Sequence, residues 1–326
     1  MMIFFTILAG FIGLLFLQKF FDIVIIGKNI RWSIGIYRGD SPFSLTDPKN
    51  INNPVLTRYE ITDIRAKFVA DPFLVKDNGN WFLFFEILDK DTKLGKIGLA
   101  SSTNGKRWQY HRVVLDEPFH LSYPHIIKWQ NEYYMIPESG IGDASVRLYK
   151  ANRFPYEWEF QQTLLTGRPF ADATLIHRNK KWWMFVSESS HDTLSIYFSE
   201  RLEGPYQAHP KNPVVFDNKI TARPGGKIIE YDGKLIRFAQ QAEPWYGKAL
   251  WAIEITTLTE TDYGEQLFMQ QPVLEGCRRH WNEMRMHHLD AHQLEDGSWI
   301  AAVDGGGRHH FRWVDKLAQQ LFFWRY

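Results

Sequence analysis

The chain has 326 residues, a formal net charge of +1 and an aromatic content of 16%. A charge so close to zero provides no long-range attraction for polyanions, so we expect no nucleic-acid partner. The single cysteine, Cys277, excludes an intrachain disulfide and a cysteine-based zinc site. The 13 Trp, 14 Tyr and 24 Phe residues suit a strand-rich fold and also sugar binding, because flat rings cover the apolar faces of pyranoses.

The N-terminal run, residues 1–17, carries no charged side chain and is followed by Lys19, Lys28 and Arg31. As a helix it would extend roughly 26 Å, close to the hydrocarbon thickness of a bilayer. It lacks the preceding basic residues and the small-residue cleavage site of a signal peptide. We therefore expect a transmembrane or interfacial anchor helix in residues 1–27 and a folded domain in residues 28–326. The basic residues after the run predict a membrane-anchored protein whose folded domain is cytoplasmic.

Five segments after residue 60 repeat a pattern of strand, tight turn and strand. They begin at Ala70, Ser122, Ala171, Ala222 and Leu289. Aromatic or β-branched runs flank polar turns in these segments, as in β-hairpins. The pattern recurs about every 50 residues, and further strand-like runs follow the hairpins, which is typical of propeller blades. The sequence thus predicts an all-β fold, a five-bladed β-propeller with four strands in each blade.

Too little sequence follows the fifth repeat to complete a blade. Residues 31–57 contain strand-like runs that resemble the outer half of one. An N-terminal strand paired with the last blade would remove the open edge that otherwise remains in the ring. We expect this closure, which would make the ring one domain.

Two columns of side chains are predicted at the mouth of the central channel, where the first strand of each hairpin begins and the second strand ends. The first column is Asp71, Tyr123, Asp172, Arg223 and Asp290. The second column is Glu86, Glu138, Glu188, Gln240 and Asp304. Clustered carboxylates raise one another's pKa values, which suits the acid–base chemistry of glycosidic bonds. Turn capping and ion pairs between blades would explain single positions, whereas two ringed columns favour a functional site.

Histidines from the repeats are predicted near the same mouth. They are His120, His125, His288 and His292. His288, Asp290 and His292 alternate along a strand and would share one face, as in some metal sites. A structural or sugar-binding role is the alternative for them. A divalent cation in the central channel is thus left open, and the sequence indicates no other cofactor.

Four motifs resemble a known family of propeller domains. They are HLSYP at 120–124, MIPES at 135–139, ARPGG at 222–226 and HHLDA at 287–291. Over residues 31–310 the chain resembles the propeller domain named for the N-terminal part of plant glucosamine inositolphosphorylceramide transferase. The strand starts ADPF, which contains Asp71, and ADAT, which contains Asp172, are similar to those of family 43 glycoside hydrolases.

The resemblance to family 43 implies an inverting hydrolase with an Asp base on the first blade, an orienting Asp on the third and a Glu acid on the fourth. By position it implies the role of base for Asp71 and of orienting group for Asp172. The fourth-blade position is Arg223, which cannot donate a proton at neutral pH because the pKa of a guanidinium exceeds about 12. Either Glu138 or Glu188 is the acid, or the leaving group is a phosphate that Arg223 binds.

Three functions remain open on the sequence. The leading hypothesis is glycosyl transfer in membrane-associated glycan or glycolipid assembly, with Asp71 as base and a glycan or sugar-phosphate substrate. The alternatives are an inverting glycoside hydrolase of the family 43 type and a non-catalytic sugar-binding propeller. In the two enzymatic hypotheses the catalytic residues are Asp71, Asp172, Glu138 and Glu188. The predicted substrate-binding residues are Tyr123, His125, Arg223, His288, Asp290 and Glu86.

Overall fold

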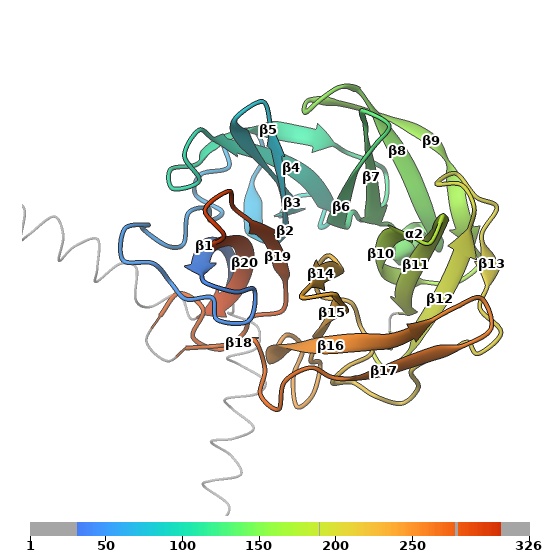
Figure 1. Ribbon diagram of the computed structural model, residues 1–326. Helices are drawn as coiled ribbons and strands as arrows, with labels where there is room; N and C mark the ends of the chain where they lie inside the picture. Colours follow the sequence, from blue (N-terminus) through green and yellow to red (C-terminus); the bar gives the residue numbers. More distant parts are fainter. Residues whose placement is uncertain (1–30, 189, 278–279, 308–326) are drawn as a thin grey trace, which may run out of the picture.

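The computed structural model describes residues 31–188, 190–277 and 280–307. Five antiparallel sheets surround a central axis (Figure 1), so the predicted five-bladed all-β propeller is confirmed. The predicted anchor in residues 1–27 lies outside the described residues. Within the described part, no helix is long and apolar enough to cross a bilayer.

The first three blades each contain four strands that pair in chain order. Blade 1 comprises β2 (Ala66–Asp77), β3 (Asn80–Asp89), β4 (Gly95–Ser102) and β5 (Gln109–Leu115). Blade 2 comprises β6 (Ser122–Trp129), β7 (Glu132–Glu138), β8 (Ser145–Arg153) and β9 (Glu157–Thr166), with the short helix α2 (Gly140–Asp143) after β7. Blade 3 comprises β10 (Phe170–Arg178), β11 (Lys181–Glu188), β12 (Leu194–Ser199) and β13 (Gln207–Ala208).

The last two blades depart from the predicted four strands. Blade 4 comprises β14 (Ile229–Tyr231), β15 (Lys234–Gln240), β16 (Ala249–Leu258), β17 (Tyr263–Leu267) and β18 (Leu274–Glu275). It has five strands because β16 is long enough to pair with β17 along one part and with β18 at its start. Among the described residues, blade 5 has three strands, β19 (Leu289–Gln293), β20 (Trp299–Gly307) and β1 (Arg31–Gly39). In place of a fourth strand, Thr46 and Leu56 make isolated bridges to β1.

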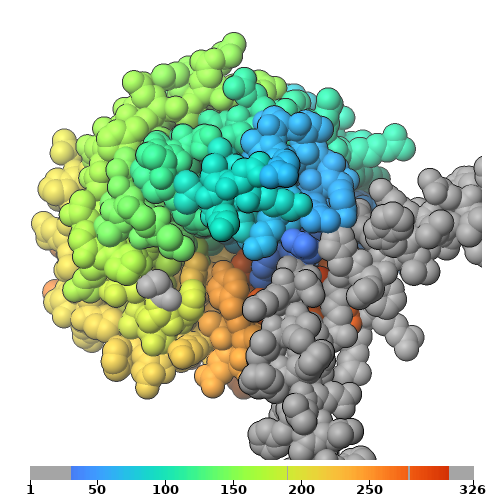
Figure 2. Space-filling model, turned by 180° about the vertical axis from the view of Figure 1, so that it is seen from behind, coloured from blue at the N-terminus to red at the C-terminus, as the bar shows by residue number. Residues whose placement is uncertain are grey.

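The N-terminal strand β1 joins the two ends of the ring. It pairs antiparallel with β20, from Arg31 opposite Gly307 to Gly39 opposite Trp299. Figure 2 shows the blue residues of the N-terminal part beside the orange and red residues of the C-terminal part. Ile34 on β1 is fully buried, and burying such a side chain contributes about 1.5–3 kcal/mol. The closing strand is therefore part of the core.

Apolar side chains pack between neighbouring blades. One cluster joins Phe73 and Phe84 of blade 1 to Met135 and Tyr149 of blade 2, all with at most 1% of their surface exposed. Because each blade is covered on both faces by its neighbours, its inner strands carry apolar side chains on both faces. The polar groups that remain buried gather mainly along the axis of the ring.

A bulge recurs at the start of the innermost strand of blades 1, 2 and 3. In blade 1, Ala70 pairs with Glu86 but Phe73 pairs with Phe84, so β2 holds one extra residue. The same register shift occurs in β6 and β10. The bulged residues have positive φ and are Asp71 (52°), Tyr123 (44°) and Asp172 (53°). A bulge redirects a side chain, and Asp tolerates a positive φ better than most residues do.

Candidate active site

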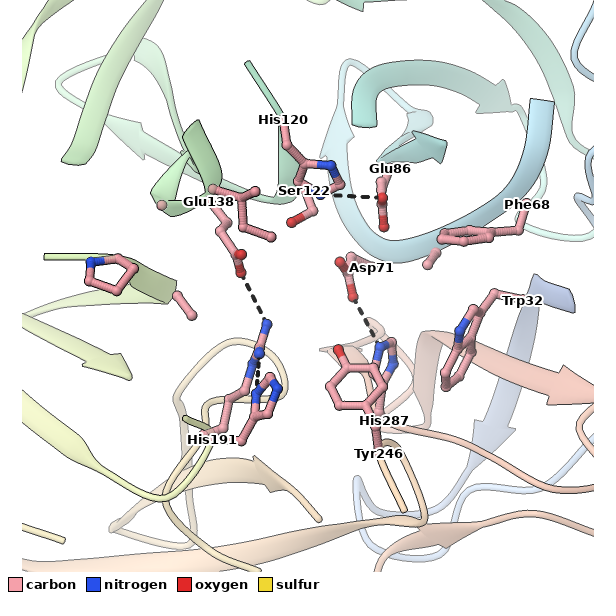
Figure 3. A pocket seen from close by; sticks show the side chains of 16 residues that line it. Trp32, Phe68, Asp71, Glu86, His120, Ser122, Glu138, His191, Tyr246 and His287 are labelled. Carbon is pink, nitrogen blue, oxygen red and sulfur yellow. Dashed lines mark hydrogen bonds and ion pairs between the residues drawn. The ribbon is translucent and has the colours of Figure 1, made fainter. Parts of the chain in front are cut away.

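A cavity of about 380 Å³ opens at the mouth of the central channel (Figure 3). Strands of several blades and the loops between them line it. Its polar lining residues are Asp71, Glu86, His120, Ser122, Glu138, His191, Arg223 and His287. Its aromatic residues are Trp32, Phe68 and Tyr246. The cavity thus combines acids, bases and flat apolar rings, a combination suited to a sugar.

One wall of the cavity holds two carboxylates on either side of a histidine. The carboxylate of Asp304 lies 2.8 Å from Nδ1 of His287 and accepts the backbone N–H of Asp71 at 3.1 Å. The Nε2 atom of His287 lies 3.7 Å from Oδ1 of Asp71. The ring of Trp32 stacks on His287, with 4.1 Å between ring centroids. Asp304 and Trp32 therefore fix the imidazole so that Nε2 faces Asp71 (Figure 3).

On another wall, Arg223 binds two carboxylates. Its Nε atom donates to Asp172 at 2.5 Å, and its Nη2 atom donates to Glu138 at 3.1 Å. Its Nη1 atom contacts Nδ1 of His191. Gln240 donates a further hydrogen bond to Asp172 at 2.6 Å. All three guanidinium nitrogens have protein partners, so Arg223 links the second, third and fourth blades.

Glu86 lies close to Asp71 in the same cavity (Figure 3). Its Oε1 atom lies 3.5 Å from Nε2 of His120. The Nδ1 atom of His120 accepts the backbone N–H of Gly95 at 2.9 Å, so the proton of the neutral ring is on Nε2, facing Glu86. Burial keeps this ring neutral by lowering the pKa of His120.

The acids in and directly beneath the cavity differ in pKa. Burial raises the pKa of Asp71 to about 7. Burial and repulsion from neighbouring carboxylates raise the pKa of Glu86 and of Glu138 well above the ordinary value. Burial also opposes ionisation of Asp172, but Arg223 lowers the pKa of that carboxyl below its usual range. Carboxyls with raised and lowered pKa values therefore lie in and directly beneath the cavity, and Asp71 titrates near neutrality.

His287 and Asp304 form an ion pair. Burial disfavours the charge on both groups and is the largest single effect on each pKa. The attraction between them, together with the other polar neighbours of each group, outweighs it. The pKa of His287 is raised and the pKa of Asp304 is lowered. Asp71 thus faces an imidazolium, which favours its ionised form.

Four of the predicted substrate-binding residues lie below the cavity and do not line it. They are Tyr123, His125, His288 and Asp290. The phenol of Tyr123 crosses from blade 2 to lie 2.8 Å from Oγ1 of Thr174, and it accepts the N–H of Gly226 at 2.8 Å. The bulge turns this large ring towards the axis of the propeller. The ring therefore spans the channel, whereas the smaller aspartates at the same place in blades 1 and 3 do not.

Asp290 lies deeper than predicted because β19 has no bulge. It pairs with Ala302 in regular register. Its Oδ2 atom accepts the N–H of Leu74 at 2.6 Å and a hydrogen bond from Lys227 at 3.1 Å. His125 follows Tyr123 by two residues and its Nε2 atom contacts the backbone of Leu175. Both side chains therefore belong to the wall of the buried channel.

Glu188 is also not brought to the cavity. Ser187 opposes Ala171 in the pairing of β11 with β10, the place that a glutamate occupies in blades 1 and 2. Glu188 lies one residue further along and forms an ion pair with Arg168 at 3.0 Å, with 31% of its side chain exposed. The carboxyls that meet Asp71 and Asp172 are thus Glu86, Glu138 and Asp304.

The divalent cation that the sequence left open would compete with protein donors at both levels. In the channel, the ammonium group of Lys227 already binds Asp290. At the mouth, potential ligand atoms of Asp71, His287 and Asp304 lie within 4.8 Å of one another. However, the carboxylate of Asp304 accepts hydrogen bonds from the imidazole and from three backbone N–H groups. With these donors engaged, we derive no step through a metal.

The cavity residues that were not predicted from the sequence include four outside the repeated hairpins, namely Trp32, His191, Tyr246 and His287. Three of them lie outside named strands, and Trp32 is on the closing strand, so none belongs to the repeated hairpins. Only the HHLDA motif held a signal, because His287 directly precedes the predicted His288.

The fold is shared with solved glycoside hydrolases. A glycosyl hydrolase from Bacteroides ovatus aligns with a TM-score of 0.57 over 78% of this chain and 92% of its own, at 12% identity. RS223 β-xylosidase aligns with a TM-score of 0.52 over 64% of this chain and 77% of its own, at 17% identity. The protein is thus a five-bladed propeller of the class found in glycoside hydrolases.

The sequence places it in one family. Residues 27–306 match the family described as glucosamine inositolphosphorylceramide transferase 1, N-terminal, and the chain belongs to this family, which confirms the resemblance. Glucosamine inositolphosphorylceramide transferase 1 of Oryza sativa subsp. japonica is 36% identical over 302 residues, and that of Arabidopsis thaliana is 35% identical over 301. These matches cover 84% of this chain but 40% and 39% of the relatives. The chain thus spans about two-fifths of their length.

Proposed function

We propose that the chain is a carbohydrate-active enzyme that transfers a glycosyl unit, with Asp71 as the base that deprotonates the acceptor hydroxyl. The observation that carries this proposal is the position of Asp71, on an open cavity with a pKa raised to about 7. A carboxylate with such a pKa accepts a proton efficiently at neutral pH. The imidazolium of His287 keeps it available in its ionised form.

Two carboxyls of the same cavity are candidates for protonating the leaving group. Glu138 and Glu86 both have raised pKa values, so either could donate a proton to a departing oxygen. If one of them is the acid, Arg223 is not required to bind a phosphate leaving group, the role that the sequence suggested for it. Because Arg223 already binds Asp172 and Glu138, its main part in this proposal is to keep Asp172 ionised and Glu138 oriented.

The family's name contains a sugar and a phosphate-bearing lipid, which supports a role in membrane-associated glycan or glycolipid assembly. The donor in this proposal is a sugar linked to a phosphate or a lipid. In this proposal residues 1–27 anchor the protein in the membrane and the ring lies on the cytoplasmic side. The relatives' own activity belongs to chains of which this one matches about two-fifths, and it is carried over here only as part of the proposal.

An inverting glycoside hydrolase is the second candidate. The raised pKa of Glu138 favours it, because a buried carboxylic acid close to a carboxylate base is what hydrolysis of a glycoside requires. The two candidates differ in whether the acceptor is a hydroxyl of another molecule or water.

The test compares the purified full chain with Asp71→Asn and with a matched control, Asp232→Asn. Asp232 also has a positive φ, but it is exposed in the turn between β14 and β15, away from the cavity. Each protein is incubated with nucleotide-linked and lipid-linked sugars, and separately with aryl glycosides and oligosaccharides. We expect transfer from an activated donor, lost by about 10²–10⁴-fold in Asp71→Asn and unchanged in the control.

Other outcomes select other functions. Cleavage of glycosides without use of activated donors would establish the hydrolase instead. Full function of Asp71→Asn in vivo would defeat both enzymatic proposals and indicate a sugar-binding propeller.

A further inference from the structure

We propose that the face of the propeller that carries the cavity lies against a lipid bilayer, so that the cavity receives the sugar part of a membrane lipid. The substrate class rests on the proposed function, whereas the orientation does not. The orientation follows from where the described chain begins and ends, and from the side chains around the mouth.

Both ends of the described chain lie at the mouth. Arg31, the first residue of β1, is directly opposite Gly307, the last residue of β20. The next residue on β1, Trp32, lines the cavity, and Asp304 on β20 contacts Asp71. The segments that precede Arg31 and follow Gly307 therefore join the ring on the face of the cavity.

The sequence of these segments suits a membrane. Residues 1–17 are uncharged, and residues 18–30 connect them to Arg31. A connection of this length spans at most about 50 Å even when fully extended. After Gly307, apolar residues recur at spacings of three and four, at Phe311, Val314, Leu317, Leu321 and Trp324, a pattern typical of interfacial segments. A bilayer that holds residues 1–17 thus lies within about 50 Å of Arg31.

The mouth also carries an apolar rim, which we define as Ile141, Phe216, Ile220 and Trp245. Their exposed fractions are 58%, 73%, 39% and 37%, respectively. Ile141 itself lines the cavity, and Trp245 precedes the cavity residue Tyr246. Aromatic and aliphatic side chains exposed together around a polar pocket are characteristic of surfaces that contact lipid.

Backbone hydrogen bonds hold the loops of the rim together. The N–H of Ala242 donates to Lys219 at 2.7 Å, which joins the loop of Trp245 to the loop of Ile220. The N–H of Asn218 donates to Asp192 at 3.0 Å, beside the cavity residue His191. Three of the four apolar side chains thus belong to one braced surface beside the cavity.

The opposite face provides a matched comparison. Tyr156 lies in the turn between β8 and β9, at the far end of blade 2, and has 36% of its surface exposed, close to the value for Trp245. A tyrosine there should remain in water if only the cavity face meets the bilayer.

The experiment measures the depth of spin labels on the full chain in phosphatidylcholine vesicles. The exposed thiol of Cys277 is first removed by Cys277→Ser, and one cysteine is introduced by Phe216→Cys, Ile141→Cys or Tyr156→Cys. We expect the labels at 216 and 141 to be accessible to oxygen and protected from a water-soluble nickel complex. We expect the label at 156 to be as accessible to nickel as it is without vesicles.

The rim is tested by combining Ile141→Cys with Phe216→Ser, Ile220→Ser and Trp245→Ser. We expect the nickel accessibility of the label at 141 to rise at least threefold, whereas Tyr156→Ser in the same background leaves it unchanged. Equal nickel accessibility at 216 and 156, or protection at 156 alone, would overturn the proposed orientation. Label accessibility does not depend on catalysis, so this test is independent of the Asp71→Asn assay. The proposed orientation and the proposed function can therefore fail separately.

Discussion

At the scale of single residues, the contact of Asp71 with His287 influences the pKa of Asp71. The distance of 3.7 Å between Oδ1 and Nε2 is too long for a hydrogen bond but short enough for a strong electrostatic attraction in a buried site. Burial raises the pKa of Asp71, and the imidazolium acts in the opposite direction. The two effects together leave the pKa of Asp71 at about 7.

This balance predicts the pH dependence of activity. In the proposed function the ionised form of Asp71 is the base, so kcat/KM should rise with pH and level off above about 7. In His287→Asn the cation is lost, the pKa of Asp71 increases, and the rising limb should move to higher pH by on the order of one unit. The pH profiles of both proteins, with His177→Asn on the exposed part of β10 as control, provide the measurement. A rising limb that stays in place in His287→Asn would contradict the assignment.

Matching places in the repeats predict a position at the mouth for Asp71, Glu86, Glu138, Asp172 and Arg223. The sequence could not assign their protonation, since that depends on which carboxyl Arg223 touches. His191 and Tyr246 have no counterpart in other repeats, and their position depends on loop conformations that no periodicity encodes.

At the scale of elements, the bulge in the innermost strands decides which side chains reach the cavity. It presents Asp71 to the cavity, places Asp172 directly beneath it against Arg223, and turns Tyr123 across the channel. The hairpins were predicted from alternation and turn residues. The bulges could not be predicted, because one extra residue in a strand changes neither the alternation nor the turn residues. For the same reason the position opposite Ala171 was assigned to Glu188, whereas the structure has Ser187 there.

The bulged Tyr123 gives a prediction about stability. Its hydroxyl contacts the side chain of Thr174 and both backbone polar groups of Gly226, so it connects blades 2, 3 and 4. Tyr123→Phe should lower the free energy of unfolding by about 1–3 kcal/mol, because buried polar groups lose their partner. Urea denaturation measures the change. Tyr133→Phe, which removes a more exposed hydroxyl bound to Asp77, is the control and should cost less than about 1.5 kcal/mol. Equal losses in the two variants would contradict a connecting role for Tyr123.

At the scale of the whole molecule, the ring depends on pairing between its two chain ends. The fold class could be predicted because five repeats of one hairpin outweigh errors in any single element. The strand content of blades 4 and 5 could not, because it depends on how far β16 extends and on where the chain turns after β1.

Removal of the closing strand tests this dependence. A chain that begins at residue 28 retains β1 and should unfold cooperatively, whereas a chain that begins at residue 40 exposes the full edge of β20. We expect the shorter chain to aggregate or to lose its cooperative transition, because an unpaired apolar edge associates with other chains. Size-exclusion chromatography and thermal unfolding followed by circular dichroism provide the measurement. A monomeric, cooperatively unfolding chain from residue 40 would show that β1 is dispensable.

The adjacency of Arg31 and Gly307 has a consequence for larger proteins built on this ring. A chain can enter and leave the propeller at one place, so the ring can be inserted into a longer polypeptide or extended without breaking a blade. Any domain fused after Gly307 through a short linker begins beside the mouth. In such an architecture the added domain would lie next to the opening of the cavity.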